Sequence, residues 1–111
     1  MNIRITFRGM DHSVAIENYA TKAADTLTKY LEKEPEPVFM DVILEAHKQH
    51  AHHKVECRLN SKNFHFIIDR EGSDLYQEID HVMKIAKEEI KKIKDKMLDK
   101  RNHPDIKKDT F

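Results

Sequence analysis

Apolar residues recur along this chain with two periods, and the shorter period predicts strands. Apolar and polar positions alternate wherever one face of a sheet is expected to be buried. At the N-terminus, for example, Ile3, Ile5 and Phe7 alternate with Arg4, Thr6 and Arg8. The alternation predicts strands over four segments: 3–8, 38–47, 52–59 and 64–69.

Steps of three and four residues between apolar positions predict two amphipathic helices. The first extends from an N-cap at Ser13 to Leu31 and is ended by the prolines that begin at Pro35. The second covers 74–100 and begins at Asp74, whose carboxylate can accept a hydrogen bond from an unpaired backbone N–H. The second helix is the longest periodic segment of the chain.

The predicted order of elements is β-α-β-β-β-α. Three consecutive strands form an antiparallel meander, and the first strand joins them through a helical crossover. We therefore expect an α/β chain of the two-layer α+β kind, with a four-stranded sheet that carries both helices on one face. The chain has 111 residues, enough for one domain. We place that domain at 1–98 and expect a charged, flexible tail at 99–111.

Charge is distributed unevenly along the chain, although its 20 basic and 20 acidic residues cancel. Residues 84–101 hold eight basic and four acidic residues, a net charge of +4. A positive helix on a mildly acidic body is typical of a surface that faces a polyanion, whereas the alternative interpretation is an ordinary solvated helix. The candidate phosphate contacts are Lys84, Lys87, Lys91, Lys92, Lys94 and Lys96, with Lys22 and Lys29 in the first helix.

Four histidines lie close together in the middle of the chain, at positions 47, 50, 52 and 53. Imidazoles are good metal ligands, but His52 and His53 point to opposite faces of a strand, and no thiolate or carboxylate completes a site. We therefore predict no metal site, and interpret this segment as a basic hairpin tip. The possible secondary contacts to RNA are His50, His52, His53, Lys54 and, by stacking on a base, Tyr76.

Several classes of function are disfavoured by the composition. The single cysteine, Cys57, alternates with Val55 and Leu59 on the buried face of a strand, so we expect an inert thiol. Two glycines are too few for a phosphate-binding loop, and no catalytic motif stands out. We predict a protein without enzymatic activity or cofactor. No apolar run is long enough to cross a membrane, and one cysteine suits a reducing cytoplasm.

Two segments resemble the ribosome hibernation-promoting factor family, whose members are also called ribosome-associated translation inhibitors or sigma-factor modulation proteins. They are EGSDLYQEID at 71–80, which opens the last helix, and KIKDK at 92–96. The resemblance extends over residues 1–98 and is to the short form of the family. The family has the same order of elements, and its fold resembles a double-stranded-RNA-binding domain.

The resemblance implies a stress or stationary-phase protein that binds the rRNA of the small ribosomal subunit in the decoding region and blocks translation. Lys92, Lys94 and Lys96 match basic positions of the family. Relatives usually carry Lys or Arg at several helix positions that differ here: Glu17, Ala23, Thr26, Ile85 and Glu88. No DNA or membrane partner is expected, and the protein should be a monomer off the ribosome.

An alternative interpretation keeps the fold but changes the partner. The sheet face away from the helices is predicted to be open, and three apolar residues, Phe39, Ile43 and Ile67, point toward it. A chain that had lost ribosome affinity would then serve as a protein-interaction module through that face.

Overall fold

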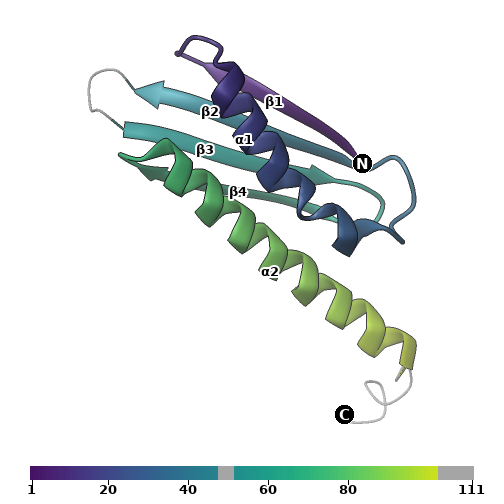
Figure 1. Cartoon of the computed structure of the whole chain (residues 1–111). Coiled ribbons are helices and arrows are strands. Elements are labelled where there is room, and N and C mark those ends of the chain that lie inside the picture. Colours follow the sequence, from purple (N-terminus) through teal and green to yellow (C-terminus); the bar gives the residue numbers. More distant parts are fainter. Residues whose placement is uncertain (48–51, 103–111) are drawn as a thin grey trace.

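A computed structural model describes residues 1–47 and 52–102, whose helices and strands follow the predicted order (Figure 1). The elements are β1 (Asn2–Arg8), α1 (Val14–Asp25), the 3-10 helix η1 (Thr28–Leu31), β2 (Phe39–His47), β3 (His52–Asn60), β4 (His65–Gly72) and α2 (Leu75–Asn102).

The four strands form one mixed sheet in the order β1-β2-β3-β4. β1 pairs with β2 in parallel, as a crossover through a helix requires, and the other two pairs are antiparallel. Figure 1 shows α1 and α2 side by side across one face of the sheet, with α1 over the β1 side and α2 over β3 and β4. The predicted two-layer α+β fold is therefore confirmed.

The core lies between the sheet and the two helices. Alternate strand residues face it, so that Val42 of β2 lies beside Cys57 of β3, and both are fully buried. Each helix contributes its apolar stripe, as the sequence predicts. The helix residues that are completely buried are Ala20 and Ala24 in α1 and Ile79, Val82, Ala86 and Ile90 in α2.

Both predicted N-caps are present. Ser13 Oγ accepts a hydrogen bond of 3.2 Å from the backbone N–H of Ile16 at the start of α1. Asp74 Oδ1 accepts one of 3.3 Å from the backbone N–H of Gln77 at the start of α2. These bonds satisfy donors that a helix start leaves unpaired.

The first helix is shorter than the predicted segment that ends at Leu31. α1 ends at Asp25, and the chain tightens into η1 through backbone bonds from Leu27 to Ala24 and from Tyr30 to Leu27, each 3.0 Å. The hydroxyl of Thr26 donates to the carbonyl of Ala23 at 2.6 Å. Thr26 is the C-cap of α1, and the tighter i→i+3 bonds that follow it end the α-helix at Asp25.

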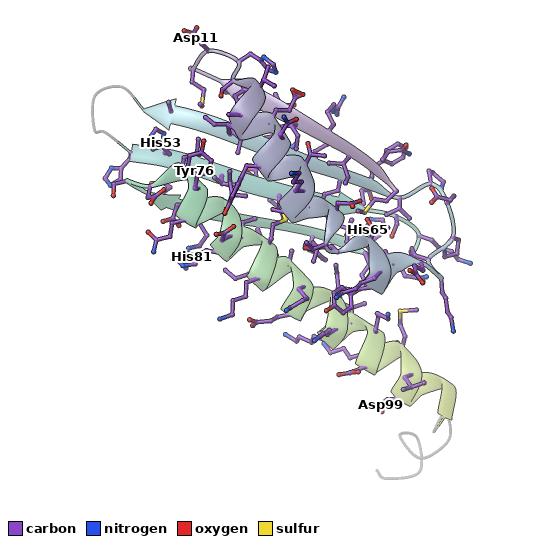
Figure 2. The ribbon with its side chains drawn as sticks, in the orientation of Figure 1. Asp11, His53, His65, Tyr76, His81 and Asp99 are labelled. Carbon is purple, nitrogen blue, oxygen red and sulfur yellow. The ribbon has the colours of Figure 1, made fainter. Side chains whose placement is uncertain are left out.

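α2 is much longer than the sheet that it covers. Its 28 residues extend over about 42 Å at 1.5 Å per residue. The C-terminal turns project beyond the sheet, where Asp99 is found (Figure 2). The helix continues past the boundary predicted at 98, while residues 103–111 of the predicted tail lie outside the described part of the chain. Among the described residues, no helix is long and apolar enough to span a membrane.

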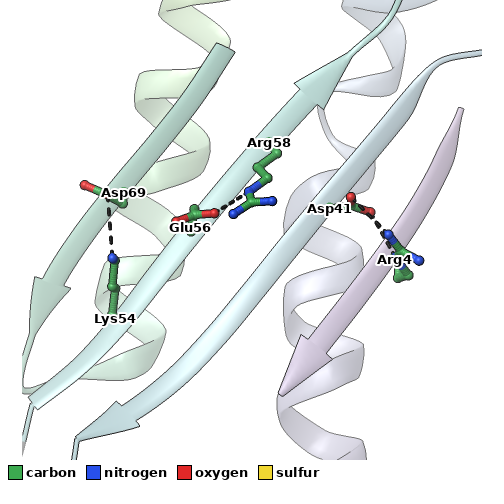
Figure 3. Close-up of polar contacts among 6 residues, drawn as sticks. All are labelled: Arg4, Asp41, Lys54, Glu56, Arg58 and Asp69. Carbon is green, nitrogen blue, oxygen red and sulfur yellow. Dashed lines mark hydrogen bonds and ion pairs between the residues drawn. The ribbon is translucent and has the colours of Figure 1, made fainter. Parts of the chain in front are cut away.

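The sheet face away from the helices is covered mainly by charged side chains. Three ion pairs lie on it: Arg4–Asp41, Arg58–Glu56 and Lys54–Asp69 (Figure 3). Two of the apolar residues predicted there, Phe39 and Ile67, are 46% and 64% exposed. Ile43 is only 6% exposed, and its register neighbours on this face are Thr6 and Glu56. The prediction that Ile43 contributes to a contact surface is therefore wrong.

Candidate nucleic-acid interface

A groove runs between α1 and α2 on the side of the helices that faces away from the sheet. The groove contains a hollow of about 260 Å³. Ala23, Thr26 and Leu27 line one side, and the α2 side is lined by Asp80, Met83, Lys84 and Lys87. Small residues on α1 therefore leave room beside two lysines of α2.

Four lysines of α2 border this groove in one stripe. Lys84, Lys87, Lys91 and Lys94 follow one another at steps of three, four and three, so that they project from the same side of the helix. Contacts agree with this placement, since Lys84 and Lys87 line the hollow while Lys91 and Lys94 reach Tyr30 in η1. We call these four residues the lysine stripe.

Tyr30 gathers three ammonium groups at the end of the groove. Lys29 Nζ and Lys91 Nζ lie 5.2 and 5.4 Å from the centre of its ring, and Lys94 Nζ donates a hydrogen bond of 2.9 Å to its carbonyl oxygen. The electron-rich ring face and the carbonyl stabilise positive charge at this point. Three lysines from two elements, Lys29, Lys91 and Lys94, are thereby held close together.

The one carboxylate that lines the hollow, Asp80, accepts hydrogen bonds from a neighbouring side chain. Tyr19 Oη donates to both oxygens of Asp80 at 2.8 Å, and the Tyr19 ring packs edge-on against Tyr76 with ring centres 4.8 Å apart. The hydrogen bond to Asp80 raises the pKa of Tyr19 above its ordinary value, and burial adds to the shift. This contact ties α1 to α2 at the opposite end of the groove from Tyr30.

The other predicted contact residues divide between different surfaces. Lys22 is exposed on α1 one turn before Thr26, and so lies beside the groove. By the helical period, Lys92 and Lys96 project from the other side of α2, together with Glu89. The eight lysines predicted as one set therefore do not form one surface.

The predicted hairpin contacts are separated in the same way. Lys54 lies on the sheet face away from the helices, where its Nζ is 3.9 Å from Asp69. His53 pairs in register with Gly72, so it lies at the end of the molecule where α2 begins. His52 is exposed at the start of β3, and His50 lies outside the described residues.

Neither the cysteine nor the histidines form a reactive or metal-binding group among the described residues. Cys57 is fully buried, and burial raises the pKa of its thiol to about 12, with a smaller contribution from Asp41. The reactive thiolate is therefore disfavoured at neutral pH. Within 1–47 and 52–102, no group of three His, Cys, Asp or Glu side chains is placed to hold a metal ion.

Comparison with known proteins gives a family. A family profile described as sigma 54 modulation protein / S30EA ribosomal protein matches residues 3–98. The chain belongs to this family. S30EA family proteins are ribosome-associated modulation and hibernation factors rather than enzymes, so the resemblance seen in segments 71–80 and 92–96 is confirmed.

Solved structures agree with the fold of the S30EA family. The N-terminal domain of Thermus thermophilus Protein Y has a TM-score of 0.70 and 22% identity, covering 83% of this chain and 98% of that one. A ribosomal subunit interface protein from Coxiella burnetii has a TM-score of 0.72 and 19% identity, covering 85% of this chain and 98% of that one. A search of curated proteins gave no significant match.

Sequence reasoning did not find the role of Tyr30 in this family member. Tyr30 lies within the segment predicted as the first helix, which ends at Leu31, and no role was assigned to it. The sequence did contain a signal for the lysine stripe, because its four lysines are spaced by three or four residues. Applying the helical period to the charged residues puts Lys92 and Lys96 on another side of the helix. That η1 would approach this stripe depends on tertiary packing.

Proposed function

We propose that this protein binds the small ribosomal subunit in its decoding region and silences translation during stress or stationary phase. Its membership of the S30EA family supports ribosome association. The observation that carries the proposal is the lysine stripe, which Lys22 of α1 and Lys29 of η1 extend across the groove. The bound groups would be rRNA phosphates.

The physical basis of binding is electrostatic. Each ammonium group that approaches a phosphate releases condensed counterions, which favours association whatever the base sequence. The interhelical groove suits this contact because Asp80 is already engaged by Tyr19 and the small side chains of Ala23 and Thr26 allow a phosphate backbone to approach. Occupancy of the decoding region by a folded domain would then exclude mRNA and tRNA without any chemical step.

The proposed setting follows from the partner. Ribosomes are cytoplasmic, so the protein would act there, and it would need no cofactor. Off the ribosome we expect a monomer. The alternative of a protein-interaction module is weakened because Ile43, one of its three expected contact residues, is buried.

Co-sedimentation with purified ribosomal subunits at rising salt tests the proposal. The wild-type chain should pellet with the small subunit at low salt and be released steeply as salt rises. The double variant Lys87→Glu, Lys91→Glu should fail to pellet, because it reverses two charges of the lysine stripe. The matched control Lys92→Glu, Lys96→Glu makes the same charge change on the other side of α2 and should retain most binding.

Two results would contradict the proposal. A wild-type chain that never pellets with the small subunit at low salt would rule out ribosome binding for this protein. Equal loss of binding in both double variants would show that overall charge, rather than the groove between the helices, determines association.

A further inference from the structure

The sheet face away from the helices is uneven, and one half of it is uncovered. Two adjacent rows of strand residues make up this half. In register across β1 to β4 they are Asn2, Phe39, Asn60 and His65, followed by Arg4, Asp41, Arg58 and Ile67. This half exposes two large apolar side chains, Phe39 and Ile67, whereas Ile43 in the next row is buried.

Two hollows lie on this half and meet at Arg58 and Asn60. One, of about 500 Å³, is lined by Phe39, Arg4 and Asn2, and the other, of about 460 Å³, by Ile67, Phe66 and His65. Phe39 and Ile67 belong to strands on either side of β3 and to successive rows, so they stand about 12 Å apart on this face. Two neighbouring flat groups can therefore lie on this face, with Arg58 between them.

The polar groups around these hollows retain unused donors. Arg4 binds Asp41 through Nε and Nη2 at 3.1 and 3.2 Å, and the Nε of Arg58 pairs with Glu56. A guanidinium has five N–H donors, so both side chains, which are 75% and 47% exposed, keep donors for a ligand.

A hydrogen bond from His65 orients the Asn60 side-chain amide, which lies beside Arg58 on β3. Its Nδ1 donates to Asn60 Oδ1 at 2.6 Å, since the amide oxygen can only accept. That bond leaves the amide NH₂ of Asn60 available as a donor toward a ligand. The two hollows therefore combine apolar surface with hydrogen-bond donors, which suits the edge of a base.

Charge differs between the two halves of the face. The uncovered half holds two arginines and one carboxylate, Asp41. The other half holds the basic residues Arg8 and Lys54 and the acidic residues Glu45, Glu56, Asp69 and Glu71. The formal charge is therefore +1 on the half that exposes the apolar side chains and −2 on the other half, so an anionic ligand is repelled less on the uncovered half.

We propose that this half of the sheet binds unpaired RNA, with one base stacked on Phe39, the next lying on Ile67 beside His65, and the connecting phosphate at Arg58. Four-stranded sheets that expose aromatic side chains bind single strands in this manner. A protein partner or a second copy fits less well, because two apolar side chains separated by an arginine offer little continuous apolar surface. The site lies on the opposite side of the molecule from the interhelical groove, and its existence does not depend on the function proposed for that groove.

Fluorescence anisotropy of a labelled, unstructured eight-nucleotide RNA tests the inference with the full chain. Phe39→Leu keeps the apolar bulk but removes the ring, and should weaken binding at least about five-fold because stacking on an aromatic ring is lost. Phe39→Tyr restores the ring and should bind within about two-fold of wild type. Leu98→Ala, which alters an exposed apolar residue on the projecting end of α2, is the matched control and should change nothing.

Backbone amide chemical shifts on addition of the same RNA locate the contact. Shifts at Phe39, Asn60 and Ile67 are expected. The inference is overturned if Phe39→Leu binds as tightly as wild type, or if the shifts are confined to α1 and α2. It is also overturned if sedimentation velocity shows a dimer that Phe39→Leu dissociates, since the face would then bind a second copy.

Discussion

At the scale of single residues, Gly72 at the end of β4 is placed against a buried carboxylate. A Cβ at Gly72 would lie 2.2 Å from Oε2 of Glu78, whose side chain is 8% exposed. Arg70 Nε lies 3.6 Å and His81 Nδ1 3.5 Å from Glu78 Oε1, so the carboxylate cannot move without losing these neighbours. A methyl group added here would therefore have to displace the end of the Glu78 side chain.

We predict that Gly72→Ala destabilises the fold by about 1–2 kcal/mol, because the added methyl group displaces Glu78. In a chain that already carries Glu78→Ala the same change should cost little, since the obstacle is gone. Urea unfolding of the four chains in this double-mutant cycle measures the coupling. Equal costs in both backgrounds would show that the side chain of Glu78 does not occupy this space.

Glu34 joins the loop before β2 to the turn between β3 and β4. Its carboxylate accepts hydrogen bonds from Ser61 Oγ at 2.7 Å and from the backbone and side-chain nitrogens of Asn63 at 2.8 and 2.9 Å. Burial alone would raise the pKa of Glu34, but these hydrogen bonds outweigh burial and hold the pKa below its ordinary value of 4.5.

A lowered folded-state pKa gives a definite pH dependence. The stabilisation by Glu34 is complete above the ordinary pKa of 4.5 and is lost as pH falls through the lower folded-state value. We predict that Glu34→Ala lowers the free energy of unfolding by about 1–3 kcal/mol at pH 7. Urea unfolding should also show that the difference between variant and wild type shrinks in acid; a difference that stays constant below about pH 4 would refute this explanation.

At the scale of elements, the groove between α1 and α2 lies on the helix side of the molecule, where we propose that rRNA binds. Asp80 is the carboxylate that lines it, and Asp80→Asn removes a negative charge while keeping an acceptor for Tyr19. We predict that this variant binds the small subunit about two- to five-fold more tightly at low salt, because one repulsion of phosphate is removed. Asp99→Asn, near the far end of α2, should leave the affinity unchanged in the same titration.

The spacing of apolar residues predicted every helix and strand except η1, because each of them buries one face. The N-caps Ser13 and Asp74 also marked where the two α-helices begin. Boundaries were less accurate where local polar contacts decide them. α1 ends earlier than the apolar spacing suggests because backbone i→i+3 bonds replace the α-helical ones after Ala24, and β4 continues to Gly72 because Arg70 and Glu71 still pair with β3. The grouping of lysines by face was missed because charges were counted along the sequence rather than around the helix.

At the scale of the whole molecule, the formal net charge is zero, but positive and negative residues are unevenly distributed. Binding to rRNA should therefore follow the local number of lysines rather than the net charge. Six lysines, four in the stripe with Lys22 and Lys29, predict that log K falls with log salt concentration at a slope of about −4.2 to −5.4. Lys87→Gln should make the slope shallower by about 0.7–0.9, and Lys92→Gln should not change it.

The central claim is that the groove between the helices meets the backbone of the small-subunit rRNA. An iron chelate attached to an introduced cysteine cleaves RNA that lies near it. Cys57 will not react with the chelate reagent, because it is buried and its pKa is raised to about 12. The label therefore goes only to a cysteine introduced at an exposed position. Thr26→Cys places the chelate in the groove, and Glu71→Cys places it on the acidic half of the sheet face.

We predict that small-subunit rRNA of the decoding region is cleaved strongly from position 26 and weakly or not at all from position 71. Strong cleavage from position 71 with none from position 26 would contradict the account.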